Sequence, residues 1–318
     1  MPPSLLTGVV MVVLMATHSA FWLAILYVFA LIRFLLPFRP VRRECAKILV
    51  RIAQGWVSSD RLLMDHVIRT KRFVSIPEGL DPEKSYLLCS NHRSWIDPLL
   101  IAVSLQRHVP FFRFFAKAGL IWLPFFGVAF WALDFPFMRR YSREHLRKNP
   151  EDRGRDLETA RQLSEKFRRM PTTVVNFSEG TRFTRKKHAA QDSPYRHLLK
   201  PRAGGSAFVI SAMGDRLAGV VDCTIVYPTD TTNFGDFLCG RIPWMALDVK
   251  LRELPARFLE GDYLDDPVHR DEVQAWMRDL WAEKDETIAR ILREHGAAGG
   301  RRTETGGASV RREVDSSD

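Results

Sequence analysis

The chain has 318 residues, long enough to bury one substantial hydrophobic core and to carry an appendage. Its formal net charge is +10, so we expect an anionic partner, either a membrane surface or a nucleic acid. No zinc-finger or RNA-binding signature is present, which disfavours nucleic acid. The four cysteines show no C-x-x-C pairing and no histidine at ligand spacing. We therefore expect neither a metal site nor a disulfide framework, and a reducing cytosolic environment fits.

Residues 1–32 contain no Asp, Glu, Lys or Arg, and the apolar run continues to Leu36. Such a run predicts a hydrophobic membrane segment, and its length and lack of an N-terminal positive charge argue against a signal peptide. As one helix it would be roughly 48 Å long, well beyond a hydrocarbon core of about 30 Å. Two arrangements remain open: a tilted helix that protrudes, or a shallow hairpin that bends near Thr17, His18 and Ser19.

A basic stretch follows the apolar run. Residues 33–72 hold ten Lys or Arg against three acids, which indicates an anionic membrane surface and predicts that the rest of the chain is cytoplasmic. Apolar residues recur there at helical spacing, at Val41, Cys45, Ile48, Leu49, Ile52 and Trp56. The pattern predicts an amphipathic helix at the headgroup level; the alternative is an ordinary domain helix with a solvated basic face.

From about Phe73 onward, short apolar runs alternate with helical patterns, which predicts an α/β domain with a mixed or parallel sheet flanked by helices. The expected strands are residues 73–76, 86–89, 111–115, 173–177 and 223–226. A polar helix is expected at residues 153–169 and a longer one at residues 268–292.

The strand expected at residues 86–89 leads into Asn91-His92-Arg93-Ser94-Trp95-Ile96-Asp97-Pro98, after which a helix is expected. His92 is the best general-base candidate, and Asp97 could orient it. On one uninterrupted helix, side chains five positions apart would point about 140° away from each other, so a turn must bring the two together. Asp97 is also expected to cap the following helix, with Pro98 as its first residue.

A second uncharged run, residues 118–133, is a poor candidate for a spanning helix because it is short and contains Pro124 and Gly127. Residues 111–137 hold nine of the chain's 21 Phe. Such residues could line a binding surface for a fatty acyl chain or form a face that inserts into the membrane. An ordinary aromatic core would have the same composition.

Another polar cluster follows the strand expected at residues 173–177: Ser178-Glu179-Gly180-Thr181-Arg182. A glycine lets the backbone approach a ligand closely, and an arginine can hold a phosphate through two parallel hydrogen bonds. Further positive charge comes from Arg185, Lys186, Lys187, Lys200 and Arg202. Taken alone, the cluster could also be an ordinary turn with a surface salt bridge.

Together, the two motifs make the chain resemble the glycerolipid acyltransferases typified by 1-acylglycerol-3-phosphate acyltransferase. The family's Asn-His-x4-Asp motif is matched by Asn91, His92 and Asp97. Its Phe-Pro-Glu-Gly-Thr-Arg motif is matched by Phe177 and Glu179 to Arg182, with Ser178 in place of the proline, and Val226-Tyr227-Pro228 matches a later apolar-proline motif. The run from Glu179 to His188 is most similar to the branch that holds endoplasmic-reticulum and lysocardiolipin acyltransferases and their bacterial relatives.

The resemblance implies a glycerol-3-phosphate acyltransferase-like fold: a membrane anchor at residues 1–40, an acyltransferase domain at 41–293 that begins with the basic helix, and a tail at 294–318 whose composition predicts disorder. It implies that His92 and Asp97 are catalytic. Substrate binding is expected from Glu179, Gly180, Thr181, Arg182, Arg139 and Lys117. Many members carry a Gly-x-Ile-x-Ile-x-Arg-like element between the two main motifs, and this chain departs from it at residues 133–140. The phosphate-binding arginine of that element could be Arg139 or Arg140, and Arg139 is favoured.

The implied activity is the transfer of a fatty acyl group from an acyl thioester, of coenzyme A or acyl carrier protein, to the free hydroxyl of a lysophospholipid. The favoured acceptor is 1-acylglycerol-3-phosphate; another lysophospholipid such as lysocardiolipin, a lipid-binding role or a hydrolytic relative are the alternatives. No metal or other cofactor is expected. Direct transfer is expected because Ser94, the nearest nucleophile, occupies a variable position of the family motif. The implied location is the cytoplasmic face of the inner membrane.

Overall fold

The computed structural model describes residues 5–68, 70–114, 116–135, 137–138, 167, 170–229, 232–261, 263 and 265–296. Within these residues, six strands form one mixed sheet in the order β1-β8-β7-β2-β6-β3. They are β1 (Lys71–Ser75), β2 (Ser85–Ser90), β3 (Phe112–Phe114), β6 (Thr173–Phe177), β7 (Leu217–Val226) and β8 (Trp244–Arg252). The short strands β4 (Ala116–Lys117) and β5 (Phe137–Met138) pair separately. The α/β class with a mixed sheet, expected from the sequence, is confirmed.

The strand directions determine where the site lies. β2, β6, β3 and β7 run parallel, whereas β8 is antiparallel to β7 and β1 is parallel to β8. Ser90, the last residue of β2, pairs with Phe177 of β6 on one side and with Cys223 of β7 on the other. The segments that follow these three strands therefore emerge at the same edge, which is where open α/β sheets bind their ligands.

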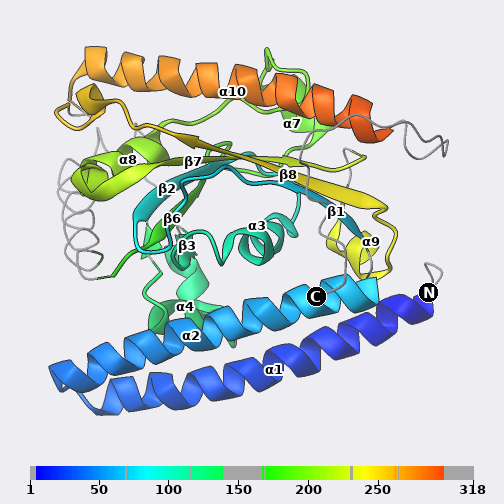
Figure 1. Ribbon diagram of the computed structural model, residues 1–318, viewed down its shortest axis with the longest axis vertical. Helices are drawn as coiled ribbons and strands as arrows, with labels where there is room; N and C mark the ends of the chain where they lie inside the picture. The colour runs from blue at the N-terminus through cyan, green and yellow to red at the C-terminus, as the bar shows by residue number, and fades with distance from the viewer. Residues whose placement is uncertain are drawn as a thin grey trace.

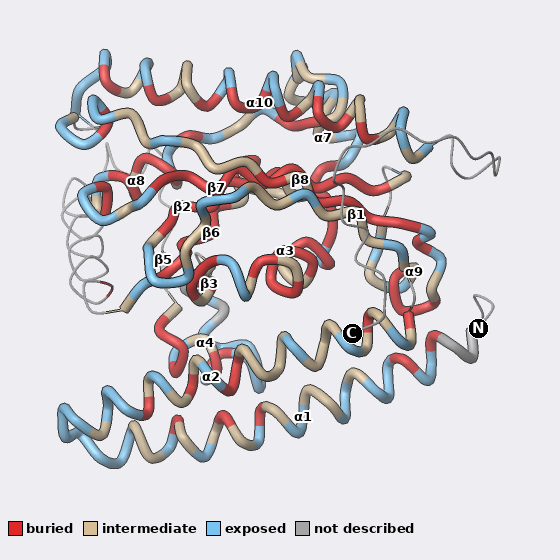
Figure 2. Tube along the Cα trace, in the orientation of Figure 1, coloured by how far each residue is buried: buried red, intermediate tan, exposed pale blue. Residues whose placement is uncertain are grey.

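Helices cover both faces of the sheet (Figure 1). α3 (Asp97–Leu105) lies against one face, and α8 (Gly204–Met213) and α10 (Pro267–Gly296) lie against the other. Along β2, Tyr86 and Leu88 belong to the core shared with α3, while Leu87 and Cys89 belong to the core shared with α8 and α10. Burial on both faces, evident along the central strands in Figure 2, explains why β2 reads as a continuous apolar run.

The strand expected at residues 173–177 is β6 with the same ends, the other four expected strands are present with shifted ends, and the helix expected at residues 268–292 is α10. β8, which lies between β1 and β7, was not predicted from the sequence. It carries Asp248 and Lys250 among its apolar residues, so no clear strand pattern stood out. The short helices α7 (Arg185–Ala190) and α9 (Phe234–Leu238) were also missed, as was α8. Of the polar helix expected at residues 153–169, only Phe167 lies within the described residues. The start of the tail expected at 294–318 is corrected, because α10 continues to Gly296, and the rest of that tail lies outside the described residues.

The N-terminal apolar run is one continuous helix, α1 (Leu5–Leu35), followed after three residues by α2 (Arg39–Leu63), which packs back along it (Figure 1). The alternative of a bend near Thr17, His18 and Ser19 is therefore wrong. The polar side chain of Thr17 is satisfied inside the helix, where its hydroxyl donates to the Val13 carbonyl at 2.8 Å. The chain reverses instead just beyond α1, between Leu36 and Phe38.

Both ends of α1 contact the rest of the molecule. Its N-terminal part packs on α9 and its C-terminal part on α4 (Phe126–Ala132). Arg33, in the last turn of α1, donates to both carboxylate oxygens of Asp134, at 2.8 Å and 3.2 Å. Because α1 is held at both ends, it lies along the domain rather than projecting away from it.

α2 is amphipathic, as expected, but its apolar face is not open to lipid. Leu49, Ile52 and Ala53 are buried in a cluster with Leu26 and Ala30 of α1. The expectation that this face lies in the headgroup layer is corrected: α1 covers it. Helical periodicity identifies an apolar face without identifying what covers that face.

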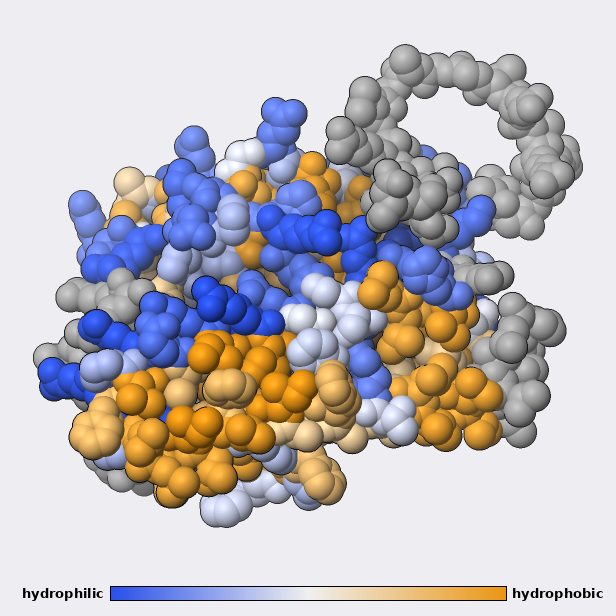
Figure 3. Space-filling view, turned by 60° about the horizontal axis from the view of Figure 1, so that its bottom comes forward, coloured by the Kyte–Doolittle hydropathy of each residue, from blue (hydrophilic) through white to orange (hydrophobic). Residues whose placement is uncertain are grey.

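Most of the exposed large apolar residues among the described residues lie in α1, in the segment before α4 and in α4 itself. Residues 118–133 do not form one helix: a 3-10 turn, η2 (Ala118–Trp122), is followed by α4. Trp122 is 86% exposed and Phe125 is 70% exposed. The exposed residues of α1 include Val9, Val12, Val13, Phe21, Val28, Leu31, Phe34 and Leu35. Figure 3 shows apolar side chains gathered on this lower part of the molecule. Among the described helices, α1 alone is long and apolar enough to cross a membrane, and such a surface is typical of membrane association.

Candidate active site

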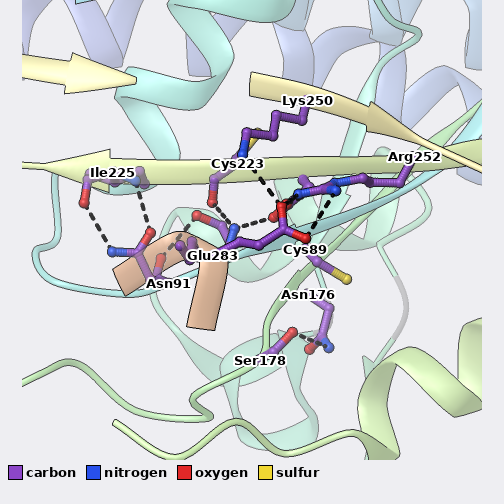
Figure 4. Close-up of polar contacts among 12 residues, drawn as sticks. Cys89, Asn91, Asn176, Ser178, Cys223, Ile225, Lys250, Arg252 and Glu283 are labelled. Atoms are coloured by element: carbon purple, nitrogen blue, oxygen red, sulfur yellow. Dashed lines mark hydrogen bonds and ion pairs between the residues drawn. The ribbon is translucent and has the colours of Figure 1, made fainter. Parts of the chain in front are cut away.

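Asn91 anchors the turn that follows β2 (Figure 4). Its side-chain amide donates to the Ile225 carbonyl at 2.9 Å, and the Ile225 N–H donates to its side-chain oxygen at 2.8 Å. The buried amide thus replaces one residue of strand backbone and continues the pairing of β2 with β7 beyond Ser90. This requires both a donor and an acceptor on one short side chain, which Asn supplies.

Asp97 is the centre of the turn and is fully buried. Its Oδ2 accepts hydrogen bonds from the backbone N–H groups of Arg93, at 2.6 Å, and Ser94, at 2.9 Å. Its Oδ1 accepts from the Tyr227 hydroxyl at 2.7 Å. The expectation that Asp97 caps α3 is wrong. Asp97 is the first residue of that helix, its N-cap is Ile96, and the side chain turns back to bind the loop before the helix.

The same Oδ2 atom of Asp97 lies 2.8 Å from Nδ1 of His92. The turn therefore brings together the two residues that the sequence paired. Because the carboxylate accepts from Nδ1–H, the lone pair of the imidazole lies on Nε2. The ring stacks on Phe177 with centroids 4.2 Å apart, and the His92 side chain is 18% exposed. Such an imidazole can take a proton from a molecule that approaches Nε2.

Glu179 connects the second motif to the first. One of its oxygens accepts from the His92 backbone N–H at 3.1 Å, and the other from the Leu199 N–H at 2.9 Å. The Glu179 side chain is fully buried, so none of its surface is accessible for the contact with substrate that the sequence predicts. Burial raises the pKa of the Glu179 carboxyl to about 7, opposed by the two backbone hydrogen bonds and by Arg93.

The residues that follow Glu179 are more accessible. Gly180 has a φ of +69°, a conformation in which a residue with a side chain would be strained, and Cδ of Arg202 lies 3.2 Å from where a Cβ at this position would be. Lys187 of α7 donates to the Thr181 hydroxyl at 2.6 Å and to the Arg182 carbonyl at 3.0 Å. Arg182 is half-buried, and its guanidinium lies over the Trp95 ring at 4.3 Å. This corner of the site is positively charged and suits a phosphate.

Ser178 occupies the position where the resembling family has proline. Its backbone N–H donates to the Ser90 carbonyl at 3.1 Å and so extends the pairing of β2 with β6 by one bond. Its hydroxyl accepts from the Asn176 side-chain amide at 3.1 Å (Figure 4). A proline has no N–H and could not form the first of these bonds.

A row of half-buried phenylalanines leads away from His92. Phe177, which stacks on the imidazole, lies 6.0 Å from Phe114 between ring centroids. Phe114 lies 6.1 Å from Phe135, and Phe135 lies 5.1 Å from Phe130. Phe130 belongs to α4, next to the exposed apolar segment. Part of the Phe-rich stretch therefore forms an aromatic surface between the imidazole and the apolar face.

The comparisons with known proteins agree with the resemblance that the two motifs indicate. The family model described as Acyltransferase matches residues 71–228, a range that contains the turn at Asn91–Asp97, the cluster at Phe177–Arg182 and Tyr227. The chain belongs to the acyltransferase family.

Its similarity to individual acyltransferases is distant. The chain is 24% identical over 254 residues to lysocardiolipin acyltransferase 1 of Gallus gallus, covering 76% of this chain and 62% of that protein. It is 26% identical over 219 residues to 1-acyl-sn-glycerol-3-phosphate acyltransferase delta of Mus musculus, covering 64% of this chain and 52% of that protein. The matched part is thus little more than half of each relative's own length.

The crystal structure of the 1-acyl-sn-glycerophosphate acyltransferase from Thermotoga maritima has the same fold. The two structures superpose with a TM-score of 0.50 at 16% identity, covering 94% of this chain and 98% of the other. At this identity the likeness establishes the architecture alone.

Some side chains expected at this candidate site lie outside the described part of the structure. Arg139 and Arg140 lie outside the described residues, and for Lys117 the structure describes the backbone, in β4, without the side chain. The contact of Tyr227 with Asp97 was not predicted from the sequence. Tyr227 was noted only as part of the apolar-proline motif, although a tyrosine at the end of a strand beside the motif-bearing strand has a hydroxyl available to reach the site.

Proposed function

We propose that this member of the acyltransferase family transfers a fatty acyl group from an acyl thioester to the free hydroxyl of a lysophospholipid, with 1-acylglycerol-3-phosphate as acceptor and phosphatidic acid as product. The observation that carries the proposal is the 2.8 Å hydrogen bond between Asp97 and Nδ1 of a partly exposed His92, because it leaves Nε2 as a base. Lysocardiolipin is the alternative acceptor, favoured by the likeness to the Gallus gallus protein.

In this mechanism Nε2 of His92 removes the proton from the acceptor hydroxyl as its oxygen attacks the thioester carbonyl carbon. The buried Asp97 carboxylate stabilises the imidazolium that forms. The carbon–sulfur bond then breaks, the ester is released, and the thiolate takes the proton back from the imidazolium. Each turnover thus returns His92 to its neutral form.

Direct transfer, without an acyl-enzyme, is supported by the surroundings of Ser94. Its side chain is 2% exposed, and its oxygen accepts from the Ile96 N–H at 3.3 Å. A nucleophilic serine is instead hydrogen-bonded to its base and accessible to the acyl carbon.

For the acceptor's phosphate, the proposed ligands are the Arg182 guanidinium and the Thr181 hydroxyl. The N–H of Gly180 donates to the Phe177 carbonyl at 2.9 Å, so the proposed role of Gly180 is to let the phosphate approach these two groups closely. Arg202, which lies against Gly180, is a second cation within the same corner. Glu179 is assigned a positioning role, since its carboxylate holds the backbone N–H of His92. Arg139 and Lys117 stay as proposed further contacts on the strength of the motif resemblance.

The acyl chain is proposed to lie along the aromatic row of Phe177, Phe114, Phe135 and Phe130. The row begins at the imidazole and ends at α4, so a chain that enters from the exposed apolar face would reach the base with its thioester or ester end. Aromatic surfaces of this kind bind alkyl chains by hydrophobic contact.

We further propose that α1 lies in one leaflet, parallel to the membrane plane, at the cytoplasmic face of the inner membrane. Contacts from α9 at one end and α4 at the other support this orientation, because a crossing helix would have to leave the domain at one end. The thioester of coenzyme A or acyl carrier protein would then approach from the cytoplasm.

The proposal is tested by incubating purified protein in vesicles with a labelled acyl thioester, with and without a lysophospholipid. We expect product that depends on acceptor, and a loss of about 10²- to 10⁴-fold in His92→Ala. His108→Ala, which alters an exposed histidine beyond the far end of α3, is the matched control. Free fatty acid without ester product would identify a hydrolase, and no turnover at all would leave a lipid-binding protein.

A further inference from the structure

Trp95 lies between His92 and Asp97 in the chain, and its side chain is 66% exposed. Its neighbours Ser94 and Ile96 are both buried. The turn therefore holds one large aromatic ring outside the core, on a backbone whose position is fixed. The Ser94 N–H is bound to Asp97, and the Ile96 N–H is bound to the Ser94 hydroxyl. An exposed ring on so constrained a turn is available to bind something else.

That ring is contacted by Arg182, whose guanidinium carbon lies 4.3 Å from the ring centroid. This side-chain contact joins the two motifs in addition to two hydrogen bonds at His92, one from its N–H to the Glu179 carboxylate and one to its carbonyl from Phe183. Phe183 donates its N–H to the His92 carbonyl at 2.7 Å. The base and the arginine are thus held by the same turn.

No carboxylate of the described residues pairs with the Arg182 guanidinium, although most other buried or half-buried arginines there have a hydrogen-bonding partner. A guanidinium that meets an aromatic ring through its face keeps its N–H groups, which lie in its own plane, available for an anion. A carboxylate partner would occupy those same N–H groups. The stacking with Trp95 therefore orders the side chain without occupying its donors.

We propose that Trp95 is a positioning residue that holds the Arg182 guanidinium in place to bind the phosphate of the acceptor. This inference rests on the proposed function. The Arg182 backbone is fixed by Lys187, but its long side chain has many rotamers, and ordering such a side chain on binding weakens affinity by about 3- to 10-fold. Trp95 selects one of these rotamers in advance. Because Trp95 and His92 belong to one turn, the phosphate and the reacting hydroxyl are held at a fixed separation.

The test is steady-state kinetics with 1-acylglycerol-3-phosphate and an acyl thioester. Trp95→Leu is expected to raise KM for the acceptor by about 3- to 10-fold, with kcat and the KM of the thioester within about twofold of wild type. Trp95→Phe keeps an aromatic face and is expected to restore most of the affinity. The thermal unfolding of both variants checks that the fold is intact.

A double-mutant cycle separates positioning from direct contact. If Trp95 acts through Arg182, then Trp95→Leu has no further effect on KM in an Arg182→Ala background. A further increase of the same size there would overturn the inference, as would an unchanged KM for Trp95→Leu in the wild-type background. A wild-type protein that transfers acyl groups to no lysophospholipid would instead remove the proposed function, and this inference with it. A wild type that works on another lysophospholipid keeps both, and the cycle is then run with that acceptor.

Discussion

The Tyr227 hydroxyl, at the end of β7, donates a 2.7 Å hydrogen bond to Oδ1 of Asp97, the carboxylate that orients His92. Both side chains are buried, and burial together with the adjacent Asp97 raises the pKa of Tyr227 well above its usual value. The phenol therefore stays protonated and acts as a permanent donor. A strand far along the chain thus fixes the orientation of the carboxylate in the first motif.

Replacing this donor is expected to slow the reaction more than it weakens binding. Tyr227→Phe leaves the buried Oδ1 without its partner, which costs about 1 to 3 kcal/mol. If that free energy appears in the activation barrier, kcat falls about 5- to 150-fold. Steady-state kinetics should show little change in either KM. Tyr195→Phe, whose hydroxyl bonds to a backbone carbonyl at the surface, should leave kcat unchanged. Equal losses in the two variants would contradict a specific role for Tyr227.

Asp97→Asn separates the fold of the turn from its chemistry. The amide oxygen can still accept from the N–H groups of Arg93 and Ser94, and its NH2 group can donate to the Tyr227 oxygen. What is lost is the negative charge that, in the proposed mechanism, stabilises the imidazolium. We expect kcat to fall by about 10² to 10⁴ while the unfolding free energy stays close to that of wild type.

Asp97→Ala serves as the comparison, because it removes both the charge and the acceptor. It leaves buried donors unpaired and is expected to lower stability as well as activity. An Asn variant that is as unstable as the Ala variant would show that the turn depends on the charge itself.

Glu179 makes stability depend on pH. Burial raises its folded-state pKa from 4.5 to about 7, so the folded protein binds this proton more tightly than the unfolded chain does. Its contribution to the free energy of unfolding is therefore greatest below about pH 4.5 and is lost as the pH rises through about 7. Glu179→Gln does not titrate, and it also loses one of the two acceptors, at a cost of about 1 to 3 kcal/mol.

The stability advantage of wild type over Glu179→Gln, which is the difference between their free energies of unfolding, should therefore shrink as the pH is raised from about 5 to about 8. Urea unfolding in detergent micelles measures it. The exposed Glu260→Gln is the matched control and should follow wild type at every pH. An advantage that grows with pH would mean that the two backbone hydrogen bonds outweigh burial.

Ser178→Pro restores the residue typical of the resembling motif and is expected to destabilise this chain. It removes the N–H that donates to the Ser90 carbonyl, a backbone bond worth about 0.5 to 1.5 kcal/mol. Ser178→Ala keeps that N–H and loses only the hydroxyl contact with Asn176. Denaturant unfolding should therefore show that the Ser178→Pro variant is less stable than the Ser178→Ala variant. A proline variant at least as stable as the alanine variant would contradict the importance of the added backbone bond.

Local sequence patterns predicted the strands and helices whose apolar residues form an uninterrupted run or a regular stripe. β2 and β6 read as apolar runs because both of their faces are buried, and α10 has a long stripe at helical spacing. β8 escaped detection because Asp248 and Lys250 interrupt its apolar pattern. Asp248 is half-buried and lies within reach of Arg290 of α10. That pairing is made across more than forty residues, and no local rule reveals it.

For the site, the spacing of His92 and Asp97 was sufficient to predict their pairing, because only a turn could join them. The turn's actual geometry was not predictable. Asp97 was expected to cap the helix that follows, whereas it binds the loop that precedes it, since the N–H groups of Arg93 and Ser94 point into the same space as His92 Nδ1.

The sequence by itself determined the family, the mixed α/β class, the apolar N-terminal helix and the pairing of His92 with Asp97, because these depend on short motifs, composition, periodicity and spacing. Only the tertiary structure decided what supports that pair. The parallel pairing of β2 with β6 and β7 brings Glu179 to the backbone of His92 and Tyr227 to Asp97, and the same edge holds Arg182 over Trp95. The same holds for the membrane segment: its apolarity is local, but its path along the domain depends on contacts with α2, α4 and α9 that lie far apart in the chain.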